Sequence, residues 1–162
     1  MENKLNHFDQ KGNAVMVDVS GKIPTSRTAV AKGKIRVCQA VMDAVKQGTV
    51  KKGDVLGVAR VAGIMAVKQT SHLIPMCHPL MIQKCSVDFE LDEEILKLRQ
   101  SVQAKTEGQT GDGDGGAYWC ECGTFDNLLY MCKAIDKSME LTDIHLVEKS
   151  GGKSGLYRNP KE

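Results

Sequence analysis

The 162-residue sequence has few aromatic side chains: one tryptophan, three tyrosines and three phenylalanines. Proteins that bind single-stranded nucleic acid stack bases on such side chains, so this scarcity argues against a base-stacking surface. Lysine and arginine together number 22 and aspartate and glutamate 20, which leaves a net charge of only +2. This balance gives no electrostatic reason to expect a nucleic-acid partner.

Long apolar runs are also missing. No stretch approaches the roughly 20 apolar residues that span a membrane, and the opening MENKLNHFDQ is polar. We therefore expect neither a signal peptide nor a membrane anchor. The six irregularly spaced cysteines predict reduced thiols in a cytoplasmic protein. The length predicts one domain, residues 1–162, with a loose N-terminal arm at 1–13 and a flexible Gly/Lys-rich tail at 150–162.

Strand-like and helix-like segments are interleaved along the chain. Alternating apolar residues predict strands over residues 14–19, 28–37, 81–91, 95–106 and 142–149. Helices are predicted over 38–46, from Asp54 to the region before Pro75, and over 124–137. The third and fourth strands, joined by an acidic turn, predict a hairpin. This order predicts an α+β fold, with a mostly antiparallel sheet and helices packed on one face.

The most informative stretch is KGDVLGVARVAGIMAVKQTSHLIPMCHP, which begins at Lys52. Asp54 is a good N-cap, and its negative charge suits the positive end of a helix dipole. The residues that follow are almost all small or aliphatic, which predicts a helix buried on nearly all sides, between elements or between subunits. Pro75 and Pro79 hold His78 between two rigid points, as in a binding site. The alternative is an ordinary histidine in a surface turn.

Four basic clusters form a second candidate feature. They are Lys22 with Arg27, Lys51 with Lys52, Lys68 alone, and Lys149 with Lys153. Lys22, Lys52, Lys149 and Lys153 each lie close to a glycine. Exposed backbone amides beside a cation are what phosphate oxygens need. The Gly-Lys-Ser at 152–154 is not a P-loop, because the first P-loop glycine would fall at Val147. We interpret this segment as a phosphate lid; the alternative is a set of ordinary solvated lysines.

Residues 112–127 are rich in glycine, aromatic residues and cysteine. The DGDG at 112–115 hints at a calcium loop, but the third acid and the closing glutamate of such a loop are missing. Cys120, Cys122 and Cys132 could bind zinc, but their spacing is unusual and a partner pair is lacking. We therefore expect no metal and no cofactor.

Several stretches resemble a known family in the family's own order. They are MVDVSGK (16–22), KGDVLGVARVAGIMAVKQTSHLIPMCHPLMI (52–82), TEGQTG (106–111), MCKAIDKSME (131–140) and VEKSGGKSG (147–155). The chain thereby resembles the cyclic pyranopterin monophosphate synthase family (molybdenum cofactor biosynthesis protein C). The resemblance implies a ferredoxin-like α+β subunit in a homohexamer, built as a trimer of dimers. It implies a lyase without a cofactor.

The implied reaction belongs to molybdenum cofactor biosynthesis. It converts (8S)-3′,8-cyclo-7,8-dihydroguanosine 5′-triphosphate, a small molecule derived from GTP, to cyclic pyranopterin monophosphate and releases diphosphate. The resemblance places the catalytic lysines at Lys52 and Lys133. The implied substrate-binding residues are Met76, Cys77, His78, Lys22, Arg27, Lys68, Lys149 and Lys153.

The chain departs from the family between TEGQTG and MCKA. The family carries Val-Glu-Met-Glu-Ala-Leu-Thr and then an apolar helix ending in Ile-Tyr-Asp, but neither glutamate is present here. Tyr130 stands at the position of the family's catalytic aspartate, and Asp126 lies one helical turn earlier. One base inserted into a coding strand for the family's block yields Asp-Gly-Asp-Gly-Gly, the sequence at 112–116. We therefore interpret residues 112–129 as an out-of-frame translation.

Two alternatives to an active enzyme remain from the residues alone. One is a catalytically impaired nucleotide-binding subunit of the same fold, since the cations are present while the family's acids are not. The other is an unrelated metal-binding module built on the cysteines.

Overall fold

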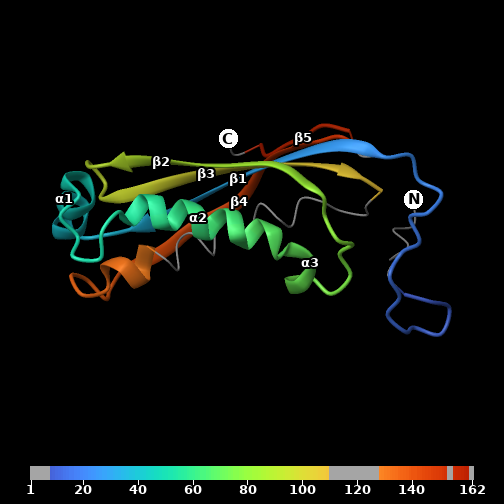
Figure 1. Ribbon diagram of the computed structural model, residues 1–162, viewed down its shortest axis with the longest axis horizontal. Coiled ribbons are helices and arrows are strands. Elements are labelled where there is room, and N and C mark those ends of the chain that lie inside the picture. Colours follow the sequence, from blue (N-terminus) through green and yellow to red (C-terminus); the bar gives the residue numbers. More distant parts are fainter. Residues whose placement is uncertain (1–7, 110–127, 153–154, 161–162) are drawn as a thin grey trace.

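A five-stranded sheet forms the centre of the computed structural model, which describes residues 8–109, 128–152 and 155–160 (Figure 1). The strand order is β2-β3-β1-β4-β5, and every pairing is antiparallel. The strands are β1 (Thr25–Arg36), β2 (Ile82–Asp92), β3 (Lys97–Gly108), β4 (Glu140–Ser150) and β5 (Tyr157–Arg158).

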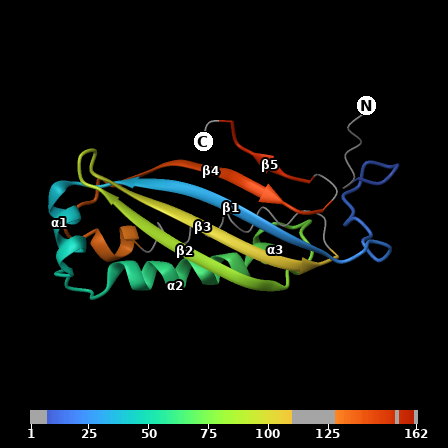
Figure 2. The same cartoon turned by 90° about the horizontal axis from the view of Figure 1, so that it is seen from above.

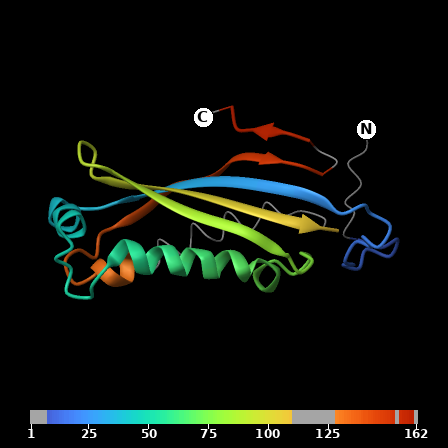
Figure 3. The same ribbon diagram turned by 45° about the horizontal axis from the view of Figure 1, so that its top comes forward.

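The helices lie on one face of this sheet (Figures 2 and 3). They are α1 (Gln39–Gln47), α2 (Val55–Lys68), α3 (Thr70–Leu73) and a helical turn at 128–132. This arrangement confirms the predicted α+β, ferredoxin-like fold with a mostly antiparallel sheet and helices packed on one face.

Period-two alternation explains why the sheet has one covered face. Along β3, the alternate residues Leu98, Gln100, Val102 and Ala104 are buried, while the residues that alternate with them are more exposed. The covered face carries three apolar clusters. The larger cluster contains Ile35, Met42, Leu98, Met131 and Cys132. The two smaller ones contain Val67, Val87, Val102 and Ala104, and Ala29, Ala31 and Leu146.

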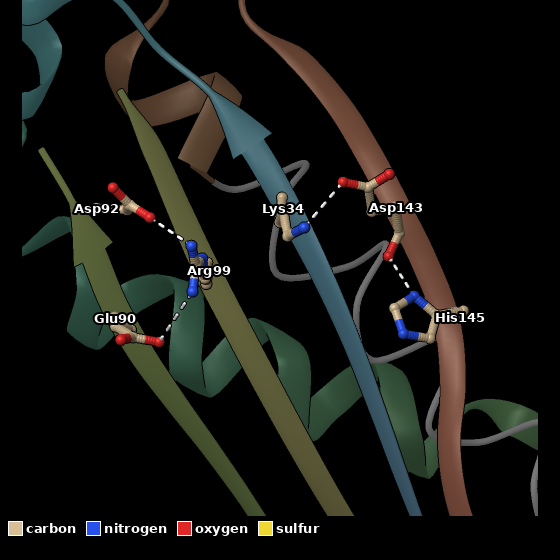
Figure 4. A network of polar contacts seen from close by, with 6 residues as sticks. All are labelled: Lys34, Glu90, Asp92, Arg99, Asp143 and His145. Carbon is tan, nitrogen blue, oxygen red and sulfur yellow. Dashed lines mark hydrogen bonds and ion pairs between the residues drawn. The ribbon is translucent and has the colours of Figure 1, made fainter. Parts of the chain in front are cut away.

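The opposite, open face of the sheet carries a network of polar contacts (Figure 4). Lys34 on β1 donates a hydrogen bond to Asp143 on β4 at 3.1 Å, and this contact lowers the pKa of the Asp143 carboxyl. Arg99 on β3 contacts Asp92 and, at 4.0 Å, Glu90 on β2. These exposed pairs stabilise the fold only slightly, but they keep this face polar.

The predicted N-cap of the central helix is confirmed. The Asp54 carboxylate accepts a hydrogen bond from the Gly57 backbone N–H at 2.9 Å. The prediction that the helix is buried on nearly all sides is wrong for a single chain. Its exposed face carries Val58, Val61 and Met65, which are 42, 58 and 58% exposed. Only one side of α2 meets the sheet, mainly at β2.

Two other sequence predictions need correction. Residues 14–19 form no strand. Within the described ranges, an isolated bridge joins Phe8 to Ala14, and no strand pairs with the rest of the segment. The helix predicted over 124–137 is helical only at 128–132 among its described residues, and it ends in turns. Residues 124–127 lie outside the described part of the chain.

The remaining strands and α1 match the predictions apart from their end residues, and α1 ends at Gly48 in a left-handed conformation. The tail contributes β5, which the sequence did not predict. No helix in the described ranges has the length and apolar character needed to cross a membrane.

Candidate active site

Lys52 and Lys133 come together at one residue, Tyr130. The Lys52 Nζ donates a hydrogen bond to the Tyr130 backbone carbonyl at 2.9 Å. The same Nζ lies 3.6 Å from the centroid of the Tyr130 ring, and the Lys133 Nζ lies 4.8 Å from it. We call Lys52 and Lys133 the lysine pair. The fold thus unites two lysines that the sequence keeps far apart.

The helical turn at 128–132 fixes this arrangement. Leu128, Met131 and Cys132 are buried in the larger apolar cluster, so the turn is anchored on one side. Tyr130 lies on the other side and is 58% exposed. The Lys133 backbone N–H donates to the Leu129 carbonyl at 2.8 Å and closes the turn.

Cys132 belongs to the core beneath the lysine pair. Burial raises the pKa of its thiol, and the nearby Lys52 charge opposes that rise. The group is therefore a neutral thiol at neutral pH. Cys120, Cys122 and the DGDG at 112–115, which prompted the zinc and calcium hypotheses, lie outside the described residues.

A second region surrounds His78. Met76, Cys77 and His78 are half-buried between the two prolines, and the Cys77 thiol donates to the His78 carbonyl at 3.3 Å. The His78 Nδ1 is buried and has no hydrogen-bond partner in the described chain. A buried polar nitrogen without a partner is costly, which is expected of a group that awaits a ligand.

The loop that contains Asp18 lies close to His78. Hydrogen bonds from Ser20 lower the pKa of Asp18, and the charge of His78 adds to this effect. Gln109, after β3, donates to the Lys22 carbonyl at 2.6 Å and so holds the same loop. The structure therefore brings Lys22 and His78 to one end of the molecule.

Arg27 lies at this end too, where β1 begins. A Cβ on Gly151 would fall 2.1 Å from the Ser26 carbonyl oxygen, and one on Gly152 would fall 3.2 Å from the Arg27 guanidinium. Both glycines also have positive φ angles. Contact with the Ser26 backbone therefore requires glycine at 151, and the positive φ favours glycine at 152, where the chain after β4 passes close to Arg27.

Strand register places Lys149 close to Arg27. Lys149 pairs with Ala29, which lies two residues after Arg27 on β1. Paired residues share a face of the sheet, and Ala29 is buried on the helix-covered face. Arg27 and Lys149 therefore share that face, and both are half-buried. Lys153 lies outside the described residues.

Lys68, the last residue of α2, lines a cavity of about 440 Å³ together with Met81, Gln83 and Glu107. This cavity lies where β2 begins and β3 ends. We call the region of Lys22, Arg27, Lys68, His78 and Lys149 the histidine end.

The lysine pair and the histidine end lie at opposite ends of α2. Lys52 precedes the helix, and the helix has 14 residues, which corresponds to a length of about 21 Å. Figure 1 shows the same separation, with α1 and the turn at 128–132 at one end of the molecule and α3 at the other. A single chain therefore does not bring Lys52 and Lys133 to His78.

Sequence reasoning gave no role to Gln109, and it interpreted Gly151 and Gly152 only as part of a phosphate lid. Gln109 lies within TEGQTG, one of the stretches that carry the family resemblance. Its place in that stretch was the signal that could have identified Gln109 as a candidate site residue. The need for glycine at 151 depends on contact with the Ser26 backbone, which the local sequence does not reveal.

Comparison with known proteins gives one consistent result. The model of the MoaC family matches residues 16–152. A protein of Clostridium botulinum (strain Alaska E43 / Type E3) is 55% identical over 159 residues, covering 98% of this chain and 99% of the relative. One from Clostridium perfringens (strain 13 / Type A) is 52% identical over 160 residues, covering 97% and 99%.

A third relative, from Thermoanaerobacter pseudethanolicus (strain ATCC 33223 / 39E), is 50% identical over 153 residues, covering 94% of this chain and 96% of its own length. All three relatives are named cyclic pyranopterin monophosphate synthase. The family match and the near-complete coverage agree with the resemblance seen in the sequence. The chain belongs to the MoaC family.

Proposed function

We propose that this chain is a lyase of molybdenum cofactor biosynthesis. It converts (8S)-3′,8-cyclo-7,8-dihydroguanosine 5′-triphosphate to cyclic pyranopterin monophosphate and releases diphosphate. The name carried by the relatives supports this function. The observation that carries it in this chain is the convergence of Lys52 and Lys133 at Tyr130.

The lysine pair suits the step that releases diphosphate. Negative charge builds on the departing oxygens as the cyclic phosphate forms, and two ammonium groups stabilise it. Removing one such donor typically costs about 3–4 kcal/mol of transition-state stabilisation. A lysine in this position also donates and accepts protons while the purine is rebuilt into a pterin.

The histidine end suits the binding of the triphosphate. Lys22, Arg27 and Lys149 are half-buried cations, and the chain at Gly151 and Gly152 passes close to Arg27. Cations beside exposed backbone amides hold phosphate oxygens. Lys68 and Lys153 complete the proposed phosphate-binding set, and His78 with Met76 and Cys77 binds the remainder of the substrate.

The complete site then requires two copies of the chain. The histidine end of one copy meets the lysine pair of another, since about 21 Å of helix separates them within one copy. The exposed apolar face of α2 supports such an assembly, because Val58, Val61 and Met65 border a cavity of about 430 Å³. We propose a homohexamer, built as a trimer of dimers.

We also propose a cytoplasmic location and no nucleic-acid or membrane partner. The four described cysteines are thiols rather than halves of disulfides, which suits a reducing compartment. The near-neutral net charge of +2 offers no general attraction to nucleic acid or to an acidic membrane surface.

A second candidate function is a catalytically impaired subunit that binds nucleotide. The observation that favours it is Tyr130, whose ring lies beside both lysines where the resembling family has an aspartate. The cations of the histidine end would still bind the triphosphate in such a subunit.

Incubation of the full chain with the cyclised GTP derivative, followed by measurement of diphosphate, tests both candidates. We expect diphosphate release, and a loss of about 100-fold or more in Lys52→Ala and in Lys133→Ala. Lys46→Ala is the matched control, because Lys46 is an exposed lysine that pairs with Glu93. Substrate binding without diphosphate release would support the second candidate, and absence of both would contradict the two together.

A further inference from the structure

We propose that Tyr130 is a positioning residue that holds Lys52 and Lys133 side by side through the face of its ring. This inference rests on the proposed function, since it assigns a role within the same site. It starts from two ammonium groups that lie 3.6 and 4.8 Å from one ring centroid. Both distances are within the roughly 6 Å at which an aromatic face attracts a cation.

Two ammonium groups in one place repel each other, so a favourable contact must offset that repulsion. Among the described residues, no acidic side chain forms an ion pair with Lys52 or with Lys133. The Tyr130 ring is therefore the electron-rich group, within that part of the chain, that both ammonium groups approach.

The ring is held in place by its neighbours along the chain. Met131 and Cys132 are buried in the core, which anchors the helical turn, and Tyr130 lies on its exposed side. The Tyr130 carbonyl accepts the 2.9 Å hydrogen bond from Lys52. This backbone contact does not depend on the side chain, so substitutions at Tyr130 isolate the contribution of the ring.

A ring and a carboxylate would have different effects on the lysine pair. A carboxylate carries a full negative charge and would cancel one of the two positive charges. A tyrosine ring is neutral and attracts the ammonium groups through its quadrupole, so the pair keeps its charge of +2. The arrangement therefore favours an anionic group with more than one negative charge, such as the departing diphosphate.

Nuclear magnetic resonance of the full chain with ¹³C-dimethylated lysines tests the positioning directly. We expect the Lys52 signal to be shifted upfield by the ring current in the wild type and in Tyr130→Phe, and to lose that shift in Tyr130→Leu. Lys52→Arg and Lys133→Arg assign the signals. Lys46, which pairs with Glu93, should not change in any Tyr130 variant.

The reaction provides the second readout. Tyr130→Phe should keep kcat/KM within about two-fold of the wild type. Tyr130→Leu should lower it about two- to five-fold, the loss expected for an exposed cation–ring contact. Because Tyr130 is 58% exposed, we expect Tyr130→Leu to fold; if it does not, Tyr130→Gln removes the ring with a side chain that suits an exposed helix.

Equal Lys52 signals in the wild type and in Tyr130→Leu would overturn the proposal. So would a Tyr130→Phe variant as slow as Tyr130→Leu, since the hydroxyl rather than the ring would then matter. A wild type that shows the ring-current shift but releases no diphosphate would contradict the proposed function and still support the positioning role.

Discussion

Gln100 is an anomaly among the buried residues. It is 1% exposed on the helix-covered face of β3, and neither its Oε1 nor its Nε2 has a hydrogen-bond partner among the residues that the structure describes. An unsatisfied buried polar group costs about 1–3 kcal/mol. This residue therefore lowers the stability of the fold.

Replacing Gln100 with leucine should raise stability. We expect Gln100→Leu to increase the free energy of unfolding by about 1–3 kcal/mol, because a similar volume is kept and no polar atom is left unpaired. Urea titration of the variant against the wild type measures the change. Gln103→Leu, at an exposed position of the same strand, should change stability by less than about 0.5 kcal/mol. A less stable Gln100→Leu would mean that Gln100 has a partner in solution.

Cys132 should make the free energy of unfolding depend on pH in the alkaline range. Burial raises its pKa above the ordinary value of 9.0, so the folded chain holds the thiol proton more tightly than the unfolded chain does. The contribution of this shift to the free energy of unfolding is fully present below pH 9. It is lost as the pH rises from 9 through the pKa of the thiol in the folded chain. The slope is at most about 1.4 kcal/mol per pH unit.

Unfolding experiments at pH 8 and pH 10 measure this effect. The wild type should lose more stability between the two values than Cys132→Val, which has no ionisable group at that position. Cys38→Val provides the matched comparison at a less buried cysteine. Equal losses in the wild type and in Cys132→Val would contradict the assignment.

At the scale of elements, the start of α2 affects both the fold and the site. Asp54 caps the helix by accepting from the Gly57 N–H, and Lys52 lies just before it. Asp54→Ala should lower the free energy of unfolding by about 0.5–2 kcal/mol. Asp54→Asn should keep most of it, because asparagine is an equally good cap. Thermal unfolding followed by circular dichroism distinguishes them, and similar losses in both variants would argue against capping.

The helices and strands could largely be predicted because their signals are local. Alternation marked the four long strands, and Asp54 and Gly48 marked helix ends. The prediction of a strand at 14–19 was wrong because alternation shows only that a strand is possible, and a strand also needs a neighbouring strand with which to form a ladder. The prediction that α2 is buried on nearly all sides was wrong for a related reason: an apolar composition does not show which element, if any, covers each side of a helix.

For the candidate site, the sequence named residues but did not indicate where the fold places them. Family resemblance named Lys52, Lys133 and His78, and the fold joins the first two at Tyr130 while it places His78 elsewhere. Spacing along a chain carries no information on which end of a helix each segment reaches. The contact of Tyr130 with both lysines depends on the register of the 128–132 turn against the core, which no local pattern encodes.

At the scale of the whole molecule, a site shared between copies predicts complementation. Lys52→Ala and His78→Ala should each be inactive alone. When the two are co-expressed, some sites combine the intact histidine end of one copy with the intact lysine pair of another, so part of the activity should return. Diphosphate release by the purified mixture measures it.

Lys52→Ala co-expressed with Lys133→Ala is the matched negative control, because both changes damage the same lysine pair and no mixed site would be whole. Restored activity in that control, or none in the first mixture, would contradict a site formed by two copies.

The length of α2 has a consequence for assays. If the 14 residues of this helix keep the lysine pair and the histidine end apart, an isolated chain has no complete site and should be inactive. Turnover per chain should then fall steeply when the protein is diluted below the dissociation constant of its assembly. Adding inactive Lys52→Ala chains to such a dilute solution should raise the activity per wild-type chain, because each added chain supplies an intact histidine end to the lysine pair of a wild-type chain.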